Sequence, residues 1–106
     1  MAKYLVTASY TPEGMKGVIA KGGSARRQAI DKMVSELGGR VESFHFGFGD
    51  DDAYVMIDLP DNVSAAALAM AVSASGAATA HTTVLLTPEE VDRAASTTVG
   101  YVPPGG

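Results

Sequence analysis

A histidine, a tyrosine and an aspartate occupy two neighbouring segments of this sequence in which apolar and polar residues alternate. His45 lies in the first segment, and Tyr54 and Asp58 lie in the second. An imidazole, a phenol and a carboxylate on one surface could transfer protons, or could hold a small polar molecule through hydrogen bonds. The alternative interpretation is that His45 and Tyr54 form hydrogen bonds across an interface between subunits. Both interpretations require the two segments to pair as strands.

The two segments, residues 40–48 and 53–59, are predicted to form a β-hairpin because Gly49 and three aspartates separate them. If Phe48 pairs with Ala53, every apolar side chain of the hairpin lies on one face. The other face is the candidate ligand-binding surface, and it gathers Ser43, His45, Gly47, Tyr54, Met56 and Asp58. The three aspartates lack the alternating ligand spacing of a calcium loop, so we expect a solvated turn.

In this register His45 lies opposite Met56 and diagonal to Tyr54 and Asp58, within reach of long side chains. His81, the second histidine of the chain, could join His45 and Asp58 in a metal site of two histidines and one carboxylate. Nothing in the spacing brings these residues together, so we expect no metal site. The sequence carries no complete dinucleotide-binding motif, and we expect no cofactor.

A second candidate site lies at the glycine-rich entry to a predicted helix, residues 22–27. Arg26 and Arg27 fall in the first turn of that helix. Free backbone amides and guanidinium groups suit a phosphate or a carboxylate, so both arginines are candidate ligand-binding residues. The alternative is that the glycines form a hinge between helices and that the arginines are solvated or paired across subunits.

Composition narrows the classes of partner. The chain has 106 residues and a formal net charge of −4, which gives no long-range attraction for nucleic acid. It contains no cysteine, which excludes disulfides, thiolate zinc sites and a cysteine nucleophile. The most apolar stretch, residues 63–72, is about half as long as a bilayer span, and no apolar signal core follows Met1. We therefore expect a cytoplasmic protein without nucleic-acid or membrane partners.

The remaining elements position these candidates. Strands are predicted over residues 3–10 and 77–86 in addition to the hairpin, and helices over residues 12–20, 25–37, 63–74 and 88–95. Ser24 is predicted to cap the second helix. This order predicts an α+β domain of ferredoxin-like β-α-β-β-α-β topology, with helices on one face of a four-stranded antiparallel sheet. We expect one domain over residues 1–95 and a flexible or extended tail over residues 96–106.

Two helices cannot cover both faces of such a sheet. The uncovered face would expose Tyr54 and Met56 together with residues of the outer strands. A second copy of the same sheet is the simplest cover, so we expect a homo-oligomer of two or more subunits that encloses a cavity.

The motifs of this chain, taken together, resemble those of the GYD domain family. They are residues 10–14 (YTPEG), 22–27 (GGSARR) and 37–39 (LGG), followed by the hairpin turn after Gly49. Gly49 and Asp52 fit the family's Gly-x-Tyr-Asp pattern, and Asp51 stands in the tyrosine position. The resemblance covers about residues 3–95. It implies a mostly bacterial family of the dimeric α+β barrel type with unassigned biochemistry, and it supplies no catalytic residues.

Three hypotheses about function follow. The first is a homo-oligomer that binds a small molecule in a cavity lined by the sheet. The second is a cofactor-independent enzyme of the monooxygenase, cyclase or isomerase type that uses His45, Tyr54 and Asp58. The third is a structural assembly module whose tail, residues 96–106, wraps a neighbouring subunit.

Overall fold

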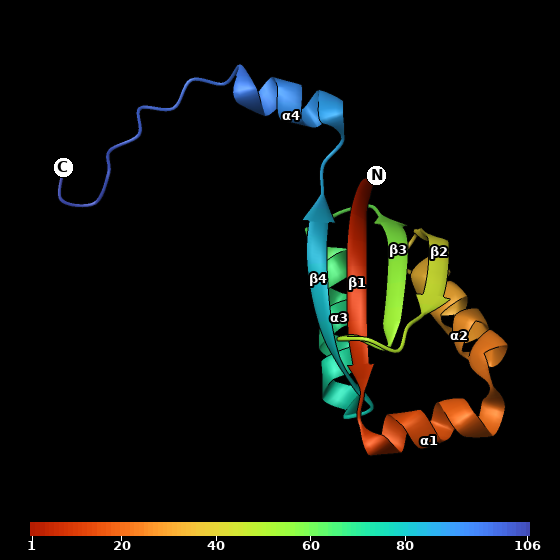
Figure 1. The fold of residues 1–106 in the computed structure, drawn as a ribbon. Helices are drawn as coiled ribbons and strands as arrows, with labels where there is room; N and C mark the ends of the chain where they lie inside the picture. Colours follow the sequence, from red (N-terminus) through yellow and green to blue (C-terminus); the bar gives the residue numbers. More distant parts are fainter.

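Four strands and four helices make up the computed structural model, which describes all 106 residues (Figure 1). The strands are β1 (Ala2–Tyr10), β2 (Arg40–Phe46), β3 (Ala53–Leu59) and β4 (Ala78–Leu85). The helices are α1 (Pro12–Lys21), α2 (Gly23–Glu36), α3 (Asn62–Ser75) and α4 (Pro88–Ala95). The strands form one antiparallel sheet in the order β2-β3-β1-β4. This topology confirms the predicted α+β, ferredoxin-like fold.

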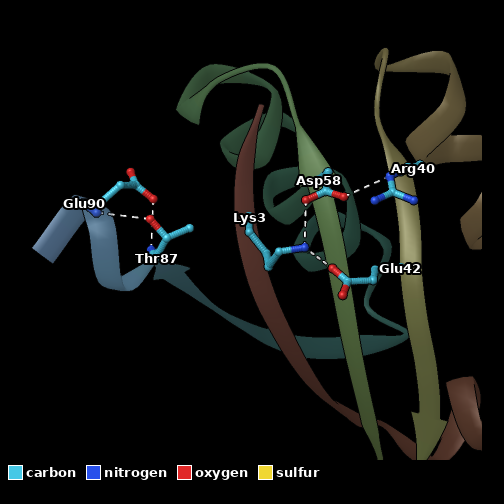
Figure 2. Close-up of polar contacts among 6 residues, drawn as sticks. All are labelled: Lys3, Arg40, Glu42, Asp58, Thr87 and Glu90. Carbon is cyan, nitrogen blue, oxygen red and sulfur yellow. Dashed lines mark hydrogen bonds and ion pairs between the residues drawn. The ribbon is translucent and has the colours of Figure 1, made fainter.

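Side-chain caps begin α1, α3 and α4. Thr11 caps α1, and Asp61 caps α3 by accepting a hydrogen bond from the Ser64 N–H at 2.9 Å. Thr87 and Glu90 form a reciprocal capping box at α4 (Figure 2). The backbone N–H groups of Ser64 and Thr87 lower the pKa of the Asp61 and Glu90 carboxyl groups, respectively. Both carboxylates therefore stabilise the fold above their unfolded pKa values, and this contribution is lost as the pH falls through their folded ones.

The start of α2 differs from the prediction. Gly22 has a φ of 87° and is the residue at which α1 ends and α2 begins. This left-handed conformation lets the chain turn into α2 within one residue, so the helix begins at Gly23 without a side-chain cap. The predicted capping role of Ser24 is therefore wrong, because Ser24 already lies inside the helix.

Helices α2 and α3 cover one face of the sheet, and no element of this chain covers the other (Figure 1). Helix α2 packs mainly over β2, and α3 packs mainly over β4. The core between helices and sheet consists of Tyr4, Val34, Val55, Ile57, Leu59 and Ala65. The Tyr4 hydroxyl donates a hydrogen bond to Asn62 Oδ1 at 2.7 Å, which satisfies the phenol of this core.

The β2–β3 hairpin exists, but its register differs by two residues from the predicted one. Phe46, and not Phe48, pairs with Ala53, and Phe48 is fully exposed. The turn is longer than predicted because the Gly47 N–H donates to the Asp52 carbonyl at 2.9 Å, which closes the loop. From Ser43 to Phe46, a shift of two residues keeps each side chain on its predicted face but changes every pair of neighbours. A register irregularity between Val41 and Ser43 offsets Arg40 and Val41 by one residue more.

The chain leaves the sheet after β4 and does not return. Helix α4 and residues 96–106 project away from the body (Figure 1). The radius of gyration is 16.7 Å, whereas about 13 Å is typical of a compact chain of this length. We call residues 86–106 the C-terminal arm. The arm leaves the uncovered sheet face open.

Candidate functional site

The uncovered side of the sheet, which we call the open face, carries the side chains that alternate with the core residues of each strand. One row of paired residues crosses all four strands. His45 pairs with Tyr54, Tyr54 pairs with Thr7, and Thr7 pairs with His81. We call these four residues the central row. The row places two imidazoles, a phenol and a hydroxyl on one surface.

Tyr54 holds a defined position in the central row. Its ring lies over Gly47, where an added Cβ atom would come within 2.8 Å of the ring. The sequence predicts that Gly47 and Tyr54 share a face, although it assigns the wrong partner to His45. Tyr54 remains 36% exposed, and His45 is exposed, so both can contact a molecule on the open face.

A second row of the open face is uncharged. Ser43 pairs with Met56, Met56 pairs with Leu5, and Leu5 pairs with Thr83. The apolar side chains of Leu5 and Met56 therefore lie on the two inner strands, directly beside the polar central row. An apolar centre with polar groups along one border is the usual character of a small-molecule site.

Asp58 lies at the far end of the open face and has partners of its own (Figure 2). Its carboxylate pairs with Lys3 Nζ at 3.1 Å and with Arg40 Nε at 3.0 Å, and Lys3 also contacts Glu42. Tyr54 precedes Asp58 by four strand residues, or roughly 13 Å. The predicted neighbourhood of His45, Tyr54 and Asp58 is therefore wrong for Asp58. The structure brings together His45 and Tyr54 alone.

Asp58 instead stabilises the sheet. Its side chain is 10% exposed, whereas that of Arg40 is 69% exposed. We expect Asp58→Asn to lower the free energy of unfolding by about 1–2 kcal/mol, because one buried acceptor serves two cations. Arg40→Gln is the matched control and should change it by less than about 0.5 kcal/mol, as for an exposed ion pair. Urea denaturation of both variants checks this, and equal losses would contradict it.

The two histidines lie on opposite edge strands. Three inter-strand spacings separate His45 from His81, or roughly 14 Å. One metal ion cannot bind both imidazoles of a single chain at that separation. No group of three histidine, aspartate or glutamate side chains in the structure has the geometry of a metal site.

The acidic turn is not simply solvated, which corrects the prediction. Asp51 accepts a hydrogen bond from Ser9 Oγ at 3.1 Å, and Asp52 accepts one from the Tyr10 N–H at 2.9 Å. The Asp52 N–H in turn donates to the Ala8 carbonyl at 2.8 Å. Asp51 and Asp52 therefore attach the hairpin turn to β1.

Arg26 and Arg27 lie on the other side of the sheet, away from the central row. Arg27 points along its own helix and pairs with Asp31 at 3.7 Å. Arg26 lies over the ring of Tyr10, with 5.9 Å between the guanidinium carbon and the ring centroid. The structure thus places the predicted hairpin candidates on the open face and Arg26 on the opposite side of the sheet. Arg27 belongs to neither site.

Sequence reasoning missed an apolar cavity of about 50 Å³ between the sheet and helices α2 and α3. Alanines supply much of its wall, and they are Ala8, Ala53, Ala65, Ala69, Ala78 and Ala80. Small side chains facing one another across a sheet and a helix leave space that larger side chains would fill. The many alanines at core-facing positions are the feature of the sequence that indicates such a cavity.

Comparison with known proteins gives a family but no named relative. The family model described as GYD domain matches residues 4–95, which include all four strands from Tyr4 onward and helices α1 to α4. The resemblance predicted from the sequence is therefore confirmed. No curated protein and no solved structure matches the chain. No helix combines the length and the apolar character needed to cross a membrane.

Proposed function

The chain belongs to the GYD domain family, and on that premise we propose that it acts as a homo-oligomer that binds a small molecule between paired open faces. The observation that carries the proposal is the open face itself. It exposes a four-stranded surface with Leu5 and Met56 at its centre, and neither a helix nor the C-terminal arm covers it. An uncovered sheet face with an apolar centre on a small chain favours association.

The charged side chains of the open face support a second copy of this chain as the molecule that covers it. The strands carry two cations, Lys3 and Arg40, and two anions, Glu42 and Asp58, on this face. These four charges cancel, whereas the whole chain has a net charge of −4. The excess acidic residues lie outside the strands, so the strand surfaces of two open faces can approach without net repulsion.

The central row supports a bound small molecule. His45 and Tyr54 supply hydrogen-bonding groups, and Leu5 and Met56 supply apolar contact for the body of a ligand. A proton-transfer enzyme is a weaker candidate because Asp58, the carboxylate it would use, is paired with Lys3 and distant from His45.

Native mass spectrometry and light scattering of freshly purified protein test the proposal. We expect a mass of two or more subunits at about 10 µM, with a retained small molecule on part of the population. His45→Ala should remove the retained molecule and leave the subunit number unchanged. A monomer at this concentration would refute the proposed pairing.

The C-terminal arm favours a structural assembly module as the second candidate. Its apolar side chains Leu86, Val91, Val99, Tyr101 and Val102 are each at least half exposed and lie beyond the body. In the same measurement, Val91→Glu would reduce the subunit number if the arm holds the assembly together. An unchanged subunit number in this variant would indicate that the subunits meet through the open face.

A further inference from the structure

Two neighbouring hollows lie on the helix-covered side of the sheet, opposite the central row. The first is the apolar cavity of about 50 Å³ under α2 and α3, and 14 of its 16 wall residues are hydrophobic. Val6 and Phe44 contribute from the sheet, Ile30 from α2, and Leu68 and Val72 from α3. One water molecule needs about 10–15 Å³ of such a cavity, so this space admits roughly four groups of the size of a methylene.

The second hollow is a groove of about 320 Å³ between α1 and α2. Its wall is more polar and includes Lys21, Glu13 and the backbone of Gly22. The first turn of α2 borders it and receives no side-chain cap. Free N–H groups at the start of a helix favour an anionic group nearby.

Arg26 and Tyr10 line both hollows and so mark the place where the two meet. Arg26 is the sole charged residue of the apolar cavity wall. Its Nε atom is buried and has no hydrogen-bond partner, and no ion pair of the chain involves it. The guanidinium carbon of Arg26 lies over the Tyr10 ring, 5.9 Å from the ring centroid.

An unsatisfied buried donor on a charged group is costly, and a matching acceptor would remove that cost. The acceptor that fits a guanidinium edge best is a carboxylate, which takes two parallel hydrogen bonds. The apolar cavity beside Arg26 would hold the hydrocarbon part of the same molecule.

We propose that this junction is a binding site for a small amphipathic carboxylate. The carboxylate pairs with Arg26 at the mouth, a short alkyl chain of about four carbons fills the cavity, and any larger polar part extends into the groove beside Lys21. The site lies on the opposite side of the sheet from His45 and is complete within one chain. It therefore does not depend on the pairing of open faces.

Titration of the full-length protein with pentanoate, followed by amide chemical shifts, tests the proposal. We expect saturable shifts at residues around Tyr10, Arg26 and Val72. Acetate lacks the alkyl chain, and pentan-1-ol lacks the charge, so each should bind at least about tenfold more weakly than pentanoate.

Two variants locate the binding. Arg26→Gln should weaken pentanoate at least about tenfold, whereas the matched Arg27→Gln, at the neighbouring position, should leave it within about twofold. Ala69→Leu adds bulk at the cavity wall and should abolish binding even if Arg26→Gln folds poorly. His45→Ala, which tests the open face, should have no effect on pentanoate.

The proposal is overturned by equal binding of pentanoate and pentan-1-ol, by equal effects of Arg26→Gln and Arg27→Gln, or by the absence of a saturable shift at the junction. Loss of pentanoate binding in His45→Ala would place the ligand on the open face and would also overturn it. A monomeric protein that still binds pentanoate would refute the proposed pairing and leave this site intact.

Discussion

Gly14→Ala is expected to lower the free energy of unfolding by about 3 kcal/mol. A Cβ atom on Gly14 would overlap the carbonyl oxygen of Ala77, which is a backbone atom and cannot rotate away. The same carbonyl accepts a hydrogen bond from the Thr11 N–H at 3.0 Å, and Thr11 Oγ1 donates to the Gly76 carbonyl at 2.8 Å. The first turn of α1 is therefore held against the connection between α3 and β4, and it cannot move without breaking these bonds.

Gly17→Ala, one turn later in α1, is the matched control. No atom lies within 4 Å of an added Cβ at Gly17, so the substitution meets no obstacle. It should raise the free energy of unfolding by about 0.5–1 kcal/mol, because alanine favours a helix over glycine. Urea denaturation of both variants at one protein concentration measures the difference. Effects of the same sign would show that α1 is not packed against Ala77 in solution.

These two glycines mark a limit of what the sequence predicts. Glycine inside a helical segment indicates either a close approach of backbones or a loosely formed segment. Local pattern cannot distinguish the two, because the answer depends on which distant residue lies beside each glycine. Gly14 meets Ala77, which is more than sixty residues away in the chain, and Gly17 meets nothing.

The β2–β3 hairpin shows the same limit at the candidate site. Alternation of apolar and polar residues predicts which face each side chain occupies, and His45 and Tyr54 do share a face. Alternation repeats every two residues, so a shift of two leaves the hydrophobic pattern unchanged. The turn decides the register, and it is held by contacts of Asp51 and Asp52 with β1. Those contacts depend on the order of strands in the sheet.

The apolar cavity was beyond sequence reasoning for a related reason. The cavity is the space left after side chains from four strands and two helices have packed, and no local sequence pattern predicts that space. Arg26 was a predicted ligand-binding candidate because of its helix-start position. The structure supports Arg26 as a ligand-binding candidate for a different reason, because its Nε atom is buried near Tyr10 without a hydrogen-bond partner.

Met56→Glu is expected to raise the dissociation constant of the homo-oligomer at least about a hundredfold. Met56 lies on the inner strand β3 at the centre of the open face and pairs with Leu5. In paired open faces the variant would bury a carboxylate from each subunit without a matching cation from the other, which costs several kcal/mol. In a single subunit the same carboxylate faces water, so the fold should keep its stability.

Met70→Glu makes the same chemical change on the outer surface of α3, where Met70 is 71% exposed. It should leave the dissociation constant unchanged within about twofold. Sedimentation velocity over a dilution series measures both variants, and far-UV circular dichroism confirms that each is folded. Equal dissociation constants for Met56→Glu and Met70→Glu would mean that subunits do not meet through the open face. The C-terminal arm would then be the next candidate contact, because it presents a row of exposed apolar side chains beyond the body.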